Sequence, residues 1–219
     1  VDLTVPAGAI VGLIGENGAG KTTLVNLMMR FYDTQEGSIT LDGRDIRKYT
    51  LKSLRGAFTM VLQDTWLFEG TIYENIAYGK ENASRSEVEK VAQAAHIADF
   101  INSLPNKYET MITDGGENLS KGQKQLMTIA RAMLSPAHML ILDEATSNID
   151  TRSEILIQKG LDQLMQGRTS LIIAHRLSTV RNADLILVLE HGKIIEQGSH
   201  QELLALKGKY YSLNQEQFE

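Results

Sequence analysis

The sequence predicts an α/β fold with a mainly parallel β-sheet and an inserted α-helical segment. Three short apolar runs, at residues 10–14, 139–142 and 171–174, show no polar alternation, and each ends at a glycine or a polar residue. Strands covered on both faces of a parallel sheet have this pattern. Apolar residues at helical spacing between about 64 and 135 predict the inserted segment.

The first apolar run leads into the stretch GENGAGKTT, residues 15–23, after which Leu24, Leu27 and Met28 recur at helical spacing. The stretch satisfies G-x-x-x-x-G-K-[ST], in which backbone N–H groups and the N-terminus of the next helix bind phosphate. We therefore expect a helix from about Lys21 and a nucleotide site before it. The alternative is a glycine turn with a solvated lysine.

Each residue of this stretch has an expected role. Lys21 supplies a full positive charge to the terminal phosphates, and the Thr22 hydroxyl holds Mg²⁺. The residues expected to contact the nucleotide are Gly15, Glu16, Asn17, Gly18, Ala19, Gly20, Lys21, Thr22 and Thr23.

Polar residues follow the other two of these apolar runs. Asp143 and Glu144 come after the run 139–142, and His175 follows the run 171–174. Ligands bind at the carboxyl ends of strands in open α/β sheets, so these side chains are expected to face the phosphate loop. Asp143 would hold Mg²⁺ and Glu144 would be the base that polarises the attacking water. The alternative is that the acids cap the next helix.

Three further sequence features give weaker evidence of function. His175 could reach a γ-phosphate and orient the water, whereas the other histidines are expected to be packed or on the surface. Gln63, after the apolar run 60–62, could coordinate Mg²⁺ and sense the water. The aromatic residues Trp66, Phe68 and Tyr73 are expected to pack, or to face a partner.

A second phosphate site is predicted in the stretch NLSKGQKQLMTIARAML, residues 118–134. Ser120 and Gln123 form a capping box at the start of an amphipathic helix that stops before Pro136. Ser120, Gly122 and the helix N-terminus could also bind phosphate. One nucleotide does not need two such sites unless two copies of the chain share it.

Composition excludes other classes. The 219-residue chain is 42% hydrophobic, contains no cysteine and carries a net charge of −5. Without cysteine there are no disulfides or thiolate metal sites. An acidic chain is not expected to act mainly on nucleic acid, whose partners are basic. No apolar run approaches the length of a membrane span, and the N-terminus has no signal-peptide pattern.

Six ordered motifs resemble the nucleotide-binding domain of ABC transporters: GENGAGKTT, the glutamine at position 63, LSKGQ, LILDEAT, SNID and AHRLS. The strings WLFEGTIYENI, residues 66–76, and HRLST, residues 175–179, resemble the exporter branch most. The resemblance covers the whole chain and implies a P-loop NTPase fold with an inserted helical subdomain.

The resemblance also implies a role for each motif. Residues 15–23 match the Walker A loop, Asp143 ends the Walker B strand, and Glu144 matches the catalytic glutamate. Gln63 matches the Q-loop glutamine, His175 the switch histidine, and residues 147–150 the D-loop.

Residues 119–123 match the signature. The resemblance implies that Ser120 and Gly122, followed by Gln123, would bind the γ-phosphate held by the opposite subunit. Lys121 stands at a position where the family has glycine. Asn148 and Ile149 replace the commoner D-loop pair.

The predicted domain organisation follows from these assignments. Residues 1–63 and 136–219 are expected to form the α/β ATP-binding lobe, and residues 64–135 the helical signature lobe. Capping boxes are expected at Ser86 with Glu89, Thr151 with Glu154 and Ser199 with Glu202, and a tight hairpin around Gly192. The helix that begins at Ser86 is expected to continue through Ile101.

The chain has no aromatic residue before Phe31. The aromatic side chain that stacks on adenine in this family is therefore expected upstream of Val1, in a domain truncated at its N-terminus.

The predicted function is ATP binding and hydrolysis by the motor domain of an ABC exporter. Its partners would be a second nucleotide-binding domain, identical or not, in a head-to-tail dimer around two ATP molecules, and transmembrane domains of the same transporter. The domain would lie at the cytoplasmic face of a membrane and would need ATP and Mg²⁺. The alternative is a soluble ABC-type ATPase clamp that acts on nucleic acid or the ribosome.

Overall fold

The computed structural model describes residues 1–144 and 149–218. By their contacts, these residues form two compact units. The first unit contains residues 1–59, 137–144 and 168–218, and the second contains 60–136 and 149–167. In neither described range is any helix long and apolar enough to cross a membrane.

The main sheet has six strands among the described residues, in the order β10-β9-β1-β8-β7-β4, and β4 continues into the second unit. Their bounds are β1 Ile10–Ile14, β4 Phe58–Val61, β7 Met139–Asp143, β8 Thr169–Ile173, β9 Leu185–Glu190 and β10 Lys193–Gly198. β1 pairs in parallel with β8 and β9, and β7 pairs in parallel with β8. Only β10 is antiparallel to its neighbour among the four described pairings. The predicted α/β fold with a mainly parallel sheet is confirmed.

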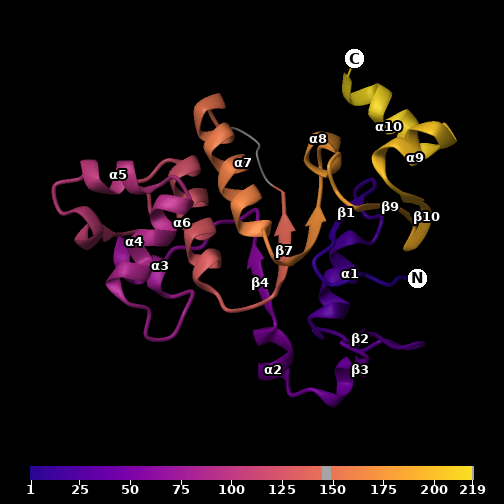
Figure 1. Cartoon of the computed structure of the whole chain (residues 1–219), viewed down its shortest axis with the longest axis horizontal. Helices are drawn as coiled ribbons and strands as arrows, with labels where there is room; N and C mark the ends of the chain where they lie inside the picture. The colour runs from indigo at the N-terminus through magenta and orange to yellow at the C-terminus, as the bar shows by residue number, and fades with distance from the viewer. Residues whose placement is uncertain (145–148, 219) are drawn as a thin grey trace. The chain divides into compact units, whose positions relative to one another are not determined.

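Parallel pairing determines where the segments that follow β1, β7 and β8 lie. The register Leu13↔Ile173 and Asp143↔Ile173 aligns the carboxyl ends of β1, β7 and β8 at one edge of the sheet. Three segments that are distant in sequence therefore begin side by side at this edge (Figure 1).

The helices of the first unit flank this sheet. α1, Lys21–Met28, begins soon after β1, and the short α8, Leu177–Val180, packs against β1. A Cβ atom on Gly12 would lie only 2.5 Å from Cγ1 of Val180, so β1 and α8 approach as closely as a glycine allows. The remaining helices are α2 Leu51–Gly56, α9 His200–Leu206 and α10 Lys209–Phe218, with a 3₁₀ helix at Ile46–Lys48 and a small hairpin of β2 Thr40–Leu41 and β3 Arg44–Asp45.

The tight hairpin predicted around Gly192 joins β9 and β10. His191 and Gly192 have φ angles of 47° and 75°, the positive values that a two-residue type I′ turn needs. The register of β10 then shifts between Ile194 and Glu196, which marks a β-bulge.

The second unit is built around α6, Lys121–Leu134, which packs against α3, α4 and α7. The other helices of this unit are α3 Ile72–Ala77, α4 Arg85–Ala94, α5 Ala98–Ser103 and α7 Thr151–Met165. The unit also contains a 3₁₀ helix at Lys107–Glu109 and the strand pair β5 Gly70–Thr71 and β6 Met111–Ile112. Large buried side chains on α6 such as Leu126, Met127 and Ile129 each contribute about 1.5–3 kcal/mol by leaving water. α6 is therefore the core of this unit.

The observed grouping differs from the predicted lobes at α7. The sequence division assigned residues 136–219 to the α/β lobe, whereas the contacts of α7 place it with the helical unit. A Cβ on Gly160 would lie 3.4 Å from Ile129, so α7 lies directly on α6.

One predicted helix was wrong in its start and its length. The capping box uses Ser84 and Glu87, not Ser86 and Glu89, and the helix ends at Ala94. Both pairs satisfy the same pattern, but only the Ser84 pair makes both bonds of the box: the Ser84 hydroxyl accepts the N–H of Glu87, and the Glu87 carboxylate accepts the N–H of Ser84 at 2.8 Å. Beyond Ala94, His96 adopts a left-handed φ of 60° and the N–H of Ile97 bonds to the carbonyl of Ala92, as in a Schellman motif. A separate helix, α5, follows.

The predicted cap of α7 was also wrong by one residue. Asp150 is the N-cap, and its carboxylate accepts a hydrogen bond from the N–H of Ser153 at 2.9 Å. Thr151 is therefore the first helical residue and not the cap. The box at Ser199 and Glu202 is confirmed, and a further box at Thr71 and Glu74 was not predicted.

Ser84→Ala is expected to lower the free energy of unfolding by about 1 kcal/mol, because it removes the side-chain acceptor that caps α4. Ser86→Ala, at an exposed position two residues later, is the matched control and is expected to stay within about 0.5 kcal/mol of the parent. Urea denaturation of the three proteins checks this. Equal losses in both variants would contradict the observed register.

Candidate nucleotide site

The phosphate loop, residues 15–20, depends on glycine backbone geometry. Gly15, Gly18 and Gly20 have φ angles of 155°, 83° and 106°. At Gly15 a Cβ would lie 2.4 Å from the carbonyl oxygen of Leu189, so a side chain there would collide with the backbone of β9. At Gly18 nothing lies within 4 Å of the corresponding position. Position 15 therefore requires glycine because the backbone of β9 approaches so closely, whereas position 18 favours glycine only because of its positive φ angle.

Lys21 is the buried cation of the loop, at 6% exposure. Its ammonium donates to the carbonyl oxygens of Gly15 and Glu16, the latter at 3.0 Å. Burial lowers the pKa of the Lys21 ammonium, and the Asp143 carboxylate opposes this shift. The ammonium is thus held inside the curve of the loop, where a phosphate oxygen would be a stronger partner than a neutral carbonyl.

The N-terminus of α1 has no side-chain cap among the described residues. Its N-cap is Gly20, whose left-handed conformation leads directly into Lys21. Thr22 and Thr23, in the first turn, and Asn17 are exposed. The first N–H groups of this helix and its partial positive charge are thus available to an anion, as the sequence predicts.

Asp143 and His175 lie beside one another at the carboxyl edge of the sheet. Asp143 ends β7, and His175 follows β8 by two residues. Nε2 of His175 is 3.8 Å from Oδ1 of Asp143, which is an ion pair when the histidine is protonated. The two predicted side chains are therefore brought together.

Glu144 is held by the segment that follows β8. Its Oε2 atom accepts the backbone N–H of His175 at 2.9 Å and that of Arg176 at 3.1 Å. Its Oε1 atom accepts the hydroxyl of Thr179. Its own N–H bonds to the carbonyl of Ile173 at 3.0 Å, which extends the pairing of β7 with β8. The proposed base thus has a fixed place relative to His175.

The chemistry of these donors fits Mg²⁺. Among the described residues, no group of three or more His, Cys, Asp or Glu side chains could hold a metal ion. Mg²⁺ does not need such a group, since it commonly binds one or two protein oxygens, substrate phosphates and water. Asp143 offers a carboxylate and Thr22 a hydroxyl, both hard oxygen donors suited to this ion.

The predicted Gln63 lies in the second unit, in the loop two residues after the end of β4, and is exposed. The apolar run 60–62 before it coincides only in part with β4, Phe58–Val61. Of the predicted D-loop, Ser147 and Asn148 fall outside the described residues.

The predicted second phosphate site is the N-terminus of α6. Ser120 and Gln123 form the expected capping box, with hydrogen bonds of 3.1 and 2.9 Å between side chains and backbone N–H groups. Lys121 is simply the first helical residue, so no glycine is needed there. Gly122 has a packing role of its own, since a Cβ would lie 2.7 Å from Cβ of Ser153 in α7.

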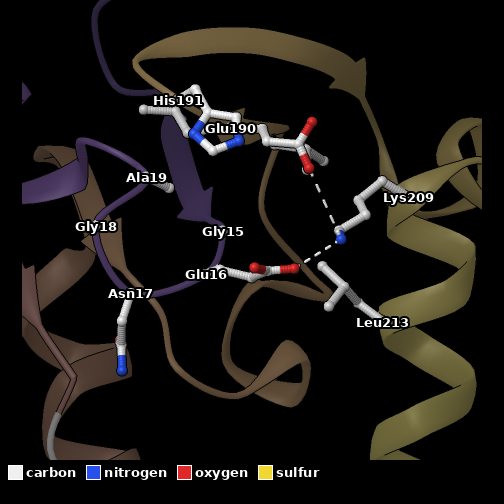
Figure 2. A pocket seen from close by; sticks show the side chains of 11 residues that line it. Gly15, Glu16, Asn17, Gly18, Ala19, Glu190, His191, Lys209 and Leu213 are labelled. Atoms are coloured by element: carbon white, nitrogen blue, oxygen red, sulfur yellow. Dashed lines mark hydrogen bonds and ion pairs between the residues drawn. The ribbon is translucent and has the colours of Figure 1, made fainter.

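A cavity lies between the phosphate loop, the end of β9 and α10 (Figure 2). Lys209, the first residue of α10, extends across it and donates to Glu16 at 2.7 Å; Glu190 is 3.8 Å away. This contact lowers the pKa of Glu16 and raises that of Lys209. The negative charge that Glu16 places in a phosphate-binding loop is therefore balanced by α10.

Glu196 fixes the start of α10. Its carboxylate accepts the backbone N–H groups of Lys209 and Tyr210, the latter at 2.9 Å. Tyr210 is fully buried, and its hydroxyl lies 2.6 Å from Nδ1 of His200. The β-bulge in β10 thus precedes the residue that caps the helix carrying Lys209.

Comparison with known proteins identifies the family. Residues 1–147 match the family model described as ABC transporter. The chain belongs to the ABC transporter family. It is an ATP-binding ATPase domain of the ABC type, as the six ordered motifs predict.

Relatives of known name agree. The chain is 53% identical over 213 residues to a fatty acid ABC transporter ATP-binding/permease protein of Mycobacterium bovis. The aligned region covers 97% of this chain and 34% of that protein. It is 54% identical over 219 residues to an ATP-dependent lipid A-core flippase of Methylobacillus flagellatus, covering 100% of this chain and 38% of that protein. The chain therefore spans about a third of the length of these relatives.

A solved structure shows the same fold. The ATP-bound structure of a bacterial Atm1-family ABC exporter superposes with a TM-score of 0.90 at 46% identity. The match covers 97% of this chain and 37% of that exporter.

Sequence reasoning did not assign a role to Lys209 or Thr179. Lys209 contacts Glu16 across 193 positions, and no local pattern marks such a pair. Thr179 lies within the string HRLST, so its position was noted, but its bond to Glu144 depends on how α8 is placed. Only the tertiary structure reveals these two contacts.

Gly15→Ala is expected to weaken ATP binding by at least tenfold and to lower the midpoint of thermal unfolding, because the new Cβ collides with the Leu189 carbonyl. Gly18→Ala is the matched control: it meets the same adverse sign of φ without a collision, and a smaller loss is expected. Titration with ATP and thermal melts of both variants measure the difference. Equal behaviour would mean that close approach is not what requires glycine at position 15.

Proposed function

We propose that this chain is the ATP-driven motor domain of an ABC exporter, working at the cytoplasmic face of a membrane together with transmembrane domains. The observation that carries the proposal is the phosphate loop, which leads into an uncapped α1 and encloses the buried Lys21 at the same sheet edge as Asp143, Glu144 and His175. The named relatives are transporters, which supports the coupling to transport.

Nucleotide binding would replace contacts that the loop now makes with itself. The Lys21 ammonium would transfer from the carbonyls of Gly15 and Glu16 to the terminal phosphates, and the N–H groups at the start of α1 would bind phosphate oxygens. Thr22 and Asp143 would hold Mg²⁺, which neutralises charge that develops on the phosphates. The match of Gln63 to the Q-loop glutamine supports a role for this residue in coordinating Mg²⁺ as well.

Hydrolysis would use the pair at the ends of β7 and β8. Glu144 accepts a proton from the attacking water, and His175 orients that water and the γ-phosphate. The bonds from the His175 and Arg176 backbone to Glu144 hold the base and the orienting histidine in one arrangement.

A second nucleotide-binding domain would complete each site. Ser120, Gly122 and Gln123 at the start of α6 would bind the γ-phosphate held by the opposite copy, so that two domains enclose two ATP molecules head to tail. The exposure of Ser120 and the intact cap of α6 support this assignment. The two units would then act as the ATP-binding lobe and the signature lobe. The comparisons give no support to a clamp on nucleic acid or the ribosome.

Glu144→Gln is expected to retain ATP binding but to lower the turnover number by about 100-fold or more, because the amide keeps the shape and cannot accept the proton. Lys21→Ala is the contrasting variant and is expected to weaken ATP binding by at least tenfold, since a charge-assisted contact is lost. ATP titration and phosphate release separate the two effects. Hydrolysis by Glu144→Gln at the parent rate would show that another residue activates the water.

Ser120→Arg is expected to leave ATP binding by the single chain within about threefold of the parent and to abolish most hydrolysis, because the bulky cation fills the partner's γ-phosphate site. Mixed with Lys21→Ala, the two lesions can fall in one shared site and leave the other whole. Hydrolysis should then recover in part. Crosslinking confirms that mixed dimers form, and no recovery in such dimers would contradict head-to-tail sharing.

A further inference from the structure

A side chain outside the motifs' assigned roles contacts the proposed base. Thr179, on α8, donates its hydroxyl to Oε1 of Glu144. The other donors to this carboxylate, among the described residues, are the backbone N–H groups of His175 and Arg176, both to Oε2. Thr179 therefore supplies the one side-chain contact in this described set.

The contact from Thr179 matters because the Glu144 carboxylate has few positions that can accept a hydrogen bond. A carboxylate has about four lone-pair positions. The two backbone donors and Thr179 use three of them within the described residues, which leaves about one, on Oε1, to take a proton from water. Without the hydroxyl, Oε1 would lose its only described donor, and the glutamate would be held through Oε2 alone.

Thr179 is itself held firmly. Its neighbours Leu177 and Val180 are buried, and Val180 lies against Gly12 of β1, the strand that leads into the phosphate loop. The position of the hydroxyl is therefore set by the same strand that sets the position of the phosphates. Thr179 itself is half-buried, which limits competition from water for its hydrogen bond.

We propose that Thr179 is a positioning residue that orients the Glu144 carboxylate for proton transfer from the attacking water. The proposal rests on the proposed role of Glu144 as the base. A glutamate side chain is flexible, and ordering it before the reaction removes that cost from the catalytic step. Thr179 does not touch ATP in this proposal, so its effect falls on turnover and not on binding.

The test compares three substitutions in the whole chain. Thr179→Val keeps the shape and removes the hydroxyl, and it is expected to lower kcat about tenfold with KM and ATP affinity within about threefold of the parent. Thr179→Ser restores a hydroxyl and is expected to regain most of kcat. Ser178→Ala, at the exposed neighbouring position, is the matched control and is expected to match the parent.

A second measurement separates positioning from a structural cap. In a Glu144→Gln background, Thr179→Val should cause no further loss of the residual rate, because both changes act on one group. If Thr179→Val folds poorly, Thr179→Ala replaces it and must give the same drop in kcat. Parent-like or faster turnover in the folded valine and alanine variants, or no rescue by serine, overturns the proposal.

The controls also separate this proposal from the proposed function. If Glu144→Gln hydrolyses ATP at the parent rate, Glu144 is not the base and both proposals fail. If Glu144→Gln is inactive while Thr179→Val turns over as the parent does, only the role of Thr179 fails.

Discussion

The parallel pairing of β9, β1, β8 and β7 is the constraint on which the rest of the site depends. Each strand pair is parallel, so each strand ends at the same edge and passes its next residues to the same place. The loop after β1, the two acids at the end of β7 and the histidine after β8 meet only for this reason. A single antiparallel pairing among them would send one group to the opposite edge. The apolar runs that the sequence uses for these strands are thus a requirement of the chemistry as well as of the core.

Two lysines contact the phosphate loop, and their roles differ. Lys21 is buried, and burial lowers the pKa of its ammonium, so it gains most from a phosphate partner. Lys209 is partly exposed and already paired with Glu16. The first acts on the ligand, while the second balances a charge of the loop itself. α10 therefore contributes to the nucleotide site without lining it.

The sequence predicted the features that depend on local pattern. The loop at Gly15, the helix at Lys21 and the cap at Ser120 each lie within a few residues of the signal that predicts them, and the strands before Asp143 and His175 were recognised because they are uniformly apolar. Where two local patterns overlap, as at Ser84 and Ser86, the pattern alone does not distinguish them, and the structure shows which serine caps the helix. Long-range pairs such as Glu16 with Lys209 and Glu144 with Thr179 leave no periodic trace.

The pairing of Glu16 with Lys209 also affects how ATP first reaches the loop. From a distance the two charges cancel, and the ammonium of Lys21 lies beneath the surface, while the chain as a whole carries a net charge of −5. The loop therefore projects little positive field into solution, and a nucleotide of the same sign as the protein is not steered toward it. Encounter would be governed by diffusion, and selection would begin only after the phosphates reach the backbone N–H groups. Capture in such a site depends on how long the nucleotide stays rather than on how often it arrives.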